Sequence, residues 1–215
     1  MFVITADQVR SRTSPDAVEG ALRIIDEVAA GRLALAAERT VGDELQTATD
    51  DARCALDLVL ALTRTGEWSV GCGLGEADTA GATSVRAARG PAFIAARDAV
   101  QAAKKRPTRF ALRASGEPGA ARGSGRAGDS ISAAGDTQSL VDLLLALRVR
   151  RTDEGWQVFD QLATGATQKA VAAALGISEQ AVSQRARAAQ VSLELDAVPA
   201  LTRALASAER DGRAG

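Results

Sequence analysis

Three carboxylates near the start of the chain have the types and spacing needed to hold a metal ion beside a phosphate. Asp7 follows an apolar, β-branched run in the segment ITADQVRSR, and Asp43 follows a glycine in TVGDELQ, with Glu44 next to it. Carboxylate oxygens are the ligands that Mg²⁺ prefers, and a cation held by two of them can orient a triphosphate. The open alternative is that both aspartates are turn residues that hydrogen-bond local amides.

A second group of residues is chemically suited to reading DNA. Residues 167–190, TQKAVAAALGISEQAVSQRARAAQ, fit a helix-turn-helix in which Gly176 ends the first helix and Ser178 caps the second. Val182 and Ala186 would form the buried side of the second helix, which turns polar side chains outward. Glutamine can bond adenine, and arginine can bond guanine or phosphate. The side chains that we expect at DNA are Gln168, Gln180, Ser183, Gln184 and Arg187.

The same residues fit a second interpretation, because any short helical hairpin with a Gly-Ile-Ser turn would have a similar pattern. The segment is also not basic. Between residues 152 and 190 there are three cationic and four acidic side chains, namely Lys169, Arg185 and Arg187 against Asp153, Glu154, Asp160 and Glu179. We therefore expect one copy to bind DNA weakly.

The elements that must position the carboxylates follow the order β-α-β-β-α-β-α-β. This order predicts an α+β fold, a ferredoxin-like palm with an antiparallel sheet covered by helices on one face. The first strand and the hairpin would then be neighbours, so Asp7 and Asp43 would converge at one end of the sheet. The expected elements are a strand at 1–7, a helix at 16–30, a hairpin turning at Gly42 and Asp43, a helix at 47–64, the strand SVGCGLGEA, the helix PAFIAARDAVQAAKK and the strand RFALRAS.

The glycines of GCGLG, residues 71–75, invite comparison with a dinucleotide-binding loop. The third glycine is misplaced and no helix opens there, so a dinucleotide site is not expected. Close packing between this strand and a helix is the better interpretation.

The chain is expected to consist of four consecutive parts. They are the palm at 1–115, a flexible Gly/Ala/Ser/Arg-rich segment at 116–136, a connector helix at 137–151 and an all-α helix-turn-helix module at 152–207.

Two sets of apolar residues are expected to hold the C-terminal parts together. In the connector, one set packs on the palm or pairs with another subunit: Leu140, Leu143, Leu144 and Leu147. In the module, the other set covers the helix-turn-helix core: Trp156, Phe159 and Leu162.

Composition excludes several classes of site. The chain has 215 residues, no histidine and a net charge of -1, which excludes Ser-His-Asp and Cys-His catalysis, HExxH metal sites and an overall field that attracts nucleic acid. Cys54 and Cys72 lack CxxC spacing and are expected to be reduced core thiols. No segment approaches the length of a membrane span, so a cytoplasmic location is expected.

Four segments, ITADQVRSR, TVGDELQ, GCGLGEA and RGPAFIAARDA, are similar to the SatD family of bacterial proteins, over residues 1–113. The layout resembles, more remotely, the palm of class III nucleotidyl cyclases. The cyclase resemblance implies that Asp7 and Asp43 are the metal pair. It also implies an Asn and an Arg four residues apart on the helix after the glycine strand, where this chain has Phe93 and Arg97. That departure bears on cyclase activity and leaves nucleotide binding open.

These observations predict a DNA-binding regulatory protein whose SatD-like palm senses a nucleotide or a metal, with Mg²⁺ as the metal. It is expected to act as a homodimer by coupling and not by turnover, and no catalytic residue is assigned. Two alternatives remain: a metal-dependent nucleotidyl or phosphoryl transfer enzyme, and a non-catalytic interaction protein.

Overall fold

The N-terminal part of the chain is built on a five-stranded sheet with the strand order β2-β3-β1-β4-β5. The computed structural model describes residues 1–116 and 133–214. Up to β5 the elements follow the order that the sequence predicts, and the fold is α+β as expected. The elements of this part are β1 (Phe2–Gln8), α1 (Val18–Ala29), β2 (Leu35–Arg39), β3 (Glu44–Thr49), α2 (Ala52–Thr63), β4 (Trp68–Leu74), α3 (Pro91–Ala103) and β5 (Phe110–Ala114).

Strand β1 lies at the centre of the sheet and pairs antiparallel with both β3 and β4. In this register Asp7 lies opposite Glu44 on one side and opposite Ser69 on the other. Strand β5 instead runs parallel to β4. The expected antiparallel sheet is therefore wrong for the last strand, because β5 follows β4 through the helical crossover α3, which returns the chain in the same direction.

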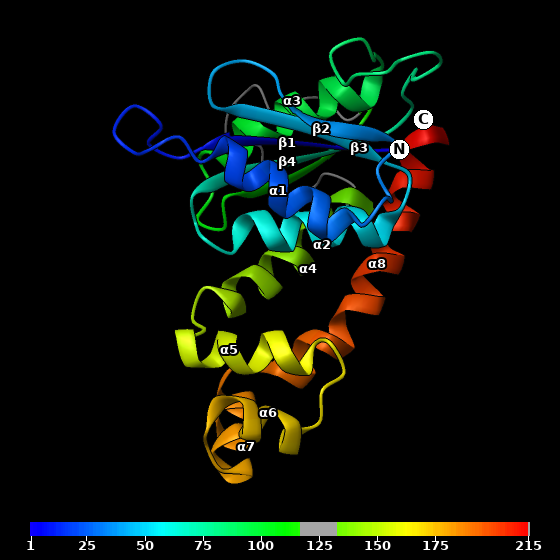
Figure 1. Cartoon of the computed structure of the whole chain (residues 1–215). Helices are drawn as coiled ribbons and strands as arrows, with labels where there is room; N and C mark the ends of the chain where they lie inside the picture. Colours follow the sequence, from blue (N-terminus) through cyan, green and yellow to red (C-terminus); the bar gives the residue numbers. More distant parts are fainter. Residues whose placement is uncertain (117–132, 215) are drawn as a thin grey trace. The chain divides into compact units, whose positions relative to one another are not determined.

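Helices cover both faces of the sheet, and not one face as expected (Figure 1). Helices α1 and α2 lie on one face and α3 lies on the other. Two glycines of β4 allow α3 to pack closely on its face of the sheet. A β-carbon at Gly71 would overlap the backbone of Val100, and one at Gly73 would overlap the backbone of Ala92 and Ala96. The backbone of α3 thus lies directly on β4, which is the close packing that the glycine run predicted.

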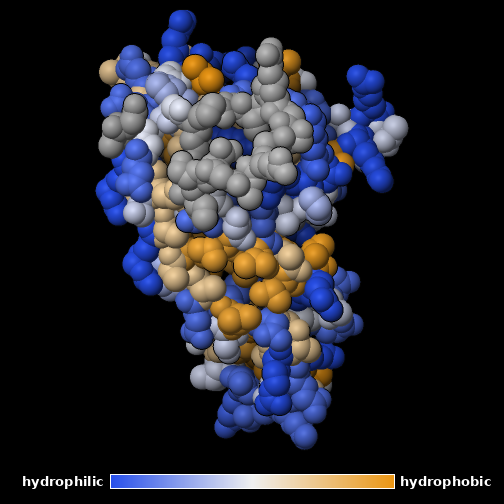
Figure 2. All heavy atoms as spheres, turned by 180° about the vertical axis from the view of Figure 1, so that it is seen from behind, coloured by the Kyte–Doolittle hydropathy of each residue, from blue (hydrophilic) through white to orange (hydrophobic). Residues whose placement is uncertain are grey.

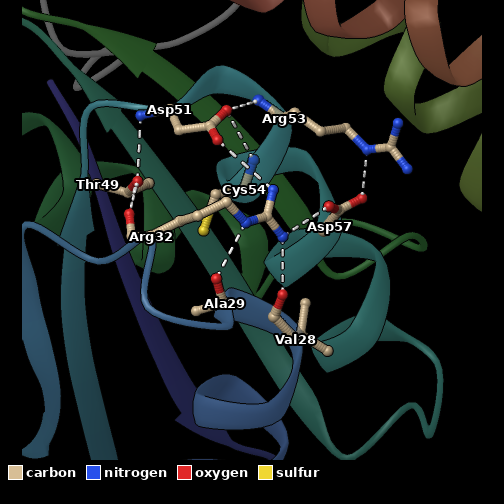
Figure 3. Close-up of polar contacts among 8 residues, drawn as sticks. All are labelled: Val28, Ala29, Arg32, Thr49, Asp51, Arg53, Cys54 and Asp57. Atoms are coloured by element: carbon tan, nitrogen blue, oxygen red, sulfur yellow. Dashed lines mark hydrogen bonds and ion pairs between the residues drawn. The ribbon is translucent and has the colours of Figure 1, made fainter.

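Arg32 joins the end of α1 to the start of α2 (Figure 3). Its guanidinium donates to the carbonyls of Val28 and Ala29 at 2.8 and 3.0 Å, and to the Asp57 carboxylate at 3.2 Å. Asp51 lies 3.5 Å from the same guanidinium and caps α2 by accepting hydrogen bonds from two amides of its first turn, at 2.7 and 3.2 Å. One arginine therefore fixes the positions of two helices on the same face of the sheet.

Cys54 and Cys72 are both free and buried, as the sequence predicted. Burial raises the pKa of both thiols, that of Cys72 to about 12. Neither side chain is therefore suited to act as a thiolate near neutral pH.

The C-terminal part is entirely helical. Its elements are α4 (Ala133–Arg148), α5 (Asp153–Leu162), α6 (Gln168–Leu175), α7 (Glu179–Ala188) and α8 (Val191–Ala214). The expected flexible segment at 116–136 lies mostly outside the described residues, and its last residues, 133–136, already belong to α4. Among the helices that the structure describes, none combines the length and the apolar composition needed to cross a bilayer.

The chain forms two compact units whose boundaries fall inside helices. One unit is Met1–Asp142 with Leu201–Gly215, and the other is Leu143–Ala200. The helical unit therefore includes the end of α4, which the sequence assigned to a connector at 137–151. It also ends within α8, before residue 207. Helices α4 and α8 each belong to both units.

Candidate functional site

Helices α5, α6 and α7 enclose a small apolar core. Four buried residues form its centre, namely Val158, Val171, Ala172 and Val182. The partly buried residues packed against them are Leu162, Ala166, Leu175, Ile177 and Ala186. Val182 and Ala186 thus face the core, as expected for the second helix of a helix-turn-helix. Val158, which the sequence pattern did not indicate, contributes to this core from α5.

Each of the three helices begins at a hydroxyl side chain that caps it. Thr152, Thr167 and Ser178 accept a hydrogen bond from the amide three residues later, at 3.2, 3.2 and 3.1 Å. Such caps satisfy amides that have no partner within the helix. Gly176 ends α6 with a φ of 66°, a conformation that glycine adopts without a steric cost. The sequence therefore specifies both ends of the turn between α6 and α7.

Most of the side chains predicted to meet DNA are exposed. Gln180, Gln184 and Arg187 lie at i, i+4 and i+7 and share one face of α7, while Ser183 beside them is half-buried. Gln168 is the first residue of α6 and is exposed too. Within the part of the chain that the structure describes, no hydrogen bond or ion pair engages any of these five side chains. Their polar groups are available to a partner molecule.

The helical unit also contains a buried ion-pair cluster formed by Arg148, Arg151 and Glu194. Glu194 of α8 accepts hydrogen bonds from Arg148 at the end of α4 and from Arg151, whose Nη2 lies 2.7 Å from its Oε2. The side chains of Arg148, Arg151 and Glu194 are 8%, 1% and 2% exposed. Two arginines therefore share the Glu194 carboxylate away from water.

Aromatic rings also lie against the two guanidinium groups. The guanidinium of Arg151 lies 4.3 Å from the ring centres of both Trp156 and Phe159, and that of Arg148 lies 4.7 Å from Trp156. Aromatic faces attract cations in this range. Trp156 and Phe159 were expected to cover the helix-turn-helix core. They instead stack on the arginines, and Leu162 alone of the three packs on that core.

The cluster also anchors α7, the helix that carries the predicted DNA contacts. Arg151 donates two hydrogen bonds, at 3.0 and 2.8 Å, to the carbonyl of Ala189, which is the C-cap of α7. This anchor was not predicted from the sequence. The signal was present, because Glu194 shares the buried face of α8 with Val191 and Val198, where an acid needs a cationic partner.

At the palm, the structure brings the predicted metal residues together only in part. The Gln8 amide donates to the Asp43 carbonyl at 3.2 Å, so the first strand and the hairpin meet. The Asp7 carboxylate, however, accepts from the ammonium of Lys104, at the end of α3, at 2.7 Å. Its side chain is 19% exposed, so it is partly shielded on the face that α3 covers.

Asp43 lines a different site, a hollow of about 300 Å³ beside the hairpin. The hollow is lined by Gln8, Ser11, Arg12, Asp16, Arg39, Gly42 and Asp43. Hydrogen bonds from the side chain of Arg39 and the amide of Val18 lower the pKa of Asp16. Since neighbouring residues of a strand point to opposite faces, Gln8 and Asp7 belong to different faces of the sheet. Asp43 thus shares a hollow with Gln8 and not with Asp7.

Glu44 lies opposite Asp7 in the sheet, and its Oε1 accepts from the Thr40 hydroxyl at 2.6 Å. Within residues 1–116 and 133–214, no three Cys, Asp or Glu side chains are grouped so that they could hold a metal ion. A cation that binds at Asp7 would have to displace the Lys104 ammonium.

Phe93 and Arg97 stand at the positions where the cyclases carry their Asn and Arg, and the structure shows what these two residues do here. Phe93 is buried in an apolar cluster with Val3 and Ala48 between α3 and the sheet, while Arg97 is exposed. Phe93 is therefore a core residue.

Comparisons with known proteins add no identification. The chain matches no protein-family model, and no curated protein or solved structure matches it.

Proposed function

We propose that this chain is a DNA-binding regulatory protein that reads DNA with the exposed face of α7. The observation that carries the proposal is the division of α7 into two sides. Val182 is fully buried in the three-helix core, while Gln180, Gln184 and Arg187 are exposed and have no partner among the described residues. A helix that is fixed on one side and offers glutamine and arginine on the other can enter a major groove.

The anchor at Arg151 makes α7 suitable for regulation. Through Ala189 and Glu194 it ties the end of α7 to the start of α8, and Arg148 ties α4 to the same carboxylate. Helices α4 and α8 also belong to the unit that contains the palm. A ligand that favours one conformation of the palm would act on α7 through these helices, since a ligand shifts an equilibrium by its differential affinity.

DNA binding is tested by fluorescence anisotropy of the full-length protein with selected genomic fragments at low salt. Gln184→Ala and Arg187→Ala are expected to weaken specific binding by about 1–3 kcal/mol each. The matched controls are Gln157→Ala on α5 and Arg203→Ala on α8, which remove the same side chains from exposed positions elsewhere. Their affinity should equal that of the unmodified protein. Equal losses in all four variants, or no binding at all, would overturn the proposal.

The sensing role of the palm is tested by thermal unfolding with nucleotides and Mg²⁺. A ligand at about 100 times its dissociation constant stabilises the folded state by roughly 2.7 kcal/mol. If the palm is instead an inert interaction module, no nucleotide will shift the melting temperature, and Asp7→Ala and Asp43→Ala will retain DNA binding.

The second candidate function is metal-dependent nucleotidyl or phosphoryl transfer. The observation in its favour is the pairing of Asp7 with Glu44 across β1 and β3, which sets two carboxylates on one face at the end of the sheet. Turnover of ATP or GTP with Mg²⁺ that is lost in both Asp7→Ala and Glu44→Ala would support it. The absence of turnover across nucleotides and divalent metals would exclude it.

A further inference from the structure

One side of α4 exposes large apolar residues along its length. Leu140, Leu143 and Leu147 are 49%, 66% and 38% exposed, and their spacing of three and four residues places them in one stripe. We name the surface formed by these three leucines, with the exposed Asp136 and Arg150 at its two ends, the α4 stripe. Figure 2 shows apolar residues gathered on the face seen from behind. A contiguous apolar area of this kind is typical of an interaction surface.

The charges at the ends of the α4 stripe are opposite. Asp136 is exposed in the first turn of α4. Arg150 is exposed just after the helix, where its amide still donates to the Leu147 carbonyl at 3.2 Å and so continues the helical turn. Across the described residues, neither side chain has a hydrogen bond or an ion pair. The stripe lies on a single helix and the turn after it.

We propose that the α4 stripe binds the α4 stripe of a second copy of this chain in antiparallel orientation. Leu143 is the seventh residue after Asp136 and the seventh before Arg150, so a twofold axis at Leu143 places the Asp136 of each copy beside the Arg150 of the other. The Leu140 of each copy then lies opposite the exposed Ala146 of the other and next to its Leu147, and the small Ala146 permits close approach. A parallel pair would put like charges together at both ends, so the charges select the antiparallel pair.

The first test measures the mass of the full chain in solution by sedimentation velocity, across about a hundredfold range of protein concentration. A reversible monomer–dimer equilibrium is expected. Leu143→Asp places two carboxylates at the axis and should raise the dimer dissociation constant by about a hundredfold or more. Ile94→Asp is the matched control, because Ile94 is 63% exposed and belongs to another helix, α3. It should leave the dimer intact.

The orientation is tested with charge reversals. Asp136→Arg and Arg150→Asp should each weaken the dimer, by about tenfold for the two symmetric contacts, and the double variant should restore it. Single variants that have no effect would contradict the antiparallel pairing. Oxidation of Leu143→Cys should also trap a covalent dimer, since Cys54 and Cys72 are buried and do not compete.

A chain that stays monomeric at every concentration, or a dimer that survives Leu143→Asp, would overturn the proposal. The readout needs no DNA, so it fails or succeeds independently of the proposed function.

Discussion

Arg151 and Glu194 form an ion pair, Nη2 to Oε2 at 2.7 Å, in which both side chains are almost completely excluded from water. The same arginine holds the C-cap of α7 through the Ala189 carbonyl. Removing water makes a charge costly unless it is paired, so this pair ties the position of α7 to the integrity of the whole cluster.

Replacing Glu194 with glutamine should destabilise the helical unit strongly. Glu194→Gln removes the carboxylate charge that Arg148 and Arg151 share, and breaking a buried pair in this way costs about 3–5 kcal/mol. Unfolding in urea, followed by the fluorescence of Trp156, measures the loss. The Trp68→Phe background isolates this signal, because Trp68 in β4 is the other tryptophan of the chain.

Asp196→Asn is the control for that experiment, because it removes a carboxylate from an exposed position two residues away on the same helix. It should change stability by less than about 0.5 kcal/mol. Similar losses in Glu194→Gln and Asp196→Asn would show that the buried cluster contributes nothing specific.

Gly71→Ala should destabilise the palm by about 1–3 kcal/mol or more, because the added methyl group overlaps the backbone of Val100 and α3 must move away. Gly20→Ala is the informative contrast. Gly20 lies inside α1, and its nearest neighbour is the end of a flexible side chain at 3.9 Å. This change should stabilise by about 0.5–1 kcal/mol, since glycine is unfavourable in a helix. Equal effects of the two changes, measured by chemical unfolding, would contradict the close packing of α3 on β4.

Alkaline pH should weaken the palm through Cys72. Burial raises its pKa from 9.0 to about 12, so the folded state keeps the thiol proton after the unfolded chain has lost it. The stabilisation is fully present below pH 9 and is lost as the pH rises from 9 towards 12, by up to about 1.4 kcal/mol per pH unit. Urea midpoints between pH 8 and about 10.5 measure the slope. In Cys72→Ala the decline should be shallower, and identical slopes would refute the assignment.

Lys104→Ala should open Asp7 to cations. The pair is partly exposed, so its loss should cost less than about 1 kcal/mol of stability. Without the ammonium, the Asp7 carboxylate loses its ion-pair partner and lies opposite Glu44 across β1 and β3. Mg²⁺ should then raise the melting temperature of Lys104→Ala more than that of the unmodified chain. The gain should disappear in the double variant with Asp7→Asn. A Mg²⁺ effect that depends on Asp7 but is the same with and without Lys104 would contradict this account.

The sequence was sufficient where local rules decide the structure. Ser178 and Gly176 mark the turn between α6 and α7 through capping and positive φ, and the structure shows both features. The glycines of β4 likewise predicted close strand–helix packing. The cap and the positive φ depend only on neighbours along the chain, and the glycines of β4 show in the sequence that no side chain stands between this strand and a covering helix.

The sequence was insufficient where partners come from distant elements. The pair of Asp7 with Lys104 joins residues 97 positions apart, and the pair of Arg148 with Glu194 joins residues 46 apart. Spacing alone could bring Asp7 towards Asp43, but it could not show that an ammonium from α3 takes the carboxylate first. Nor could it show that Trp156 lies outside the core of α5, α6 and α7 and stacks on Arg148 and Arg151.

The central claim is that α7 binds DNA, and the salt dependence of that binding in the full-length protein tests it most directly. The logarithm of the binding constant should fall linearly with the logarithm of salt concentration, and the slope should be small because the helix-turn-helix carries few cationic side chains. Arg187→Ala should reduce the slope by about one if Arg187 neutralises a phosphate, or relax sequence preference by about 1–3 kcal/mol if it reads a base. Arg203→Ala should change neither. Binding that is insensitive to salt, or that Arg187→Ala leaves unchanged in slope and in preference, would contradict the assignment of α7 as the DNA-reading helix.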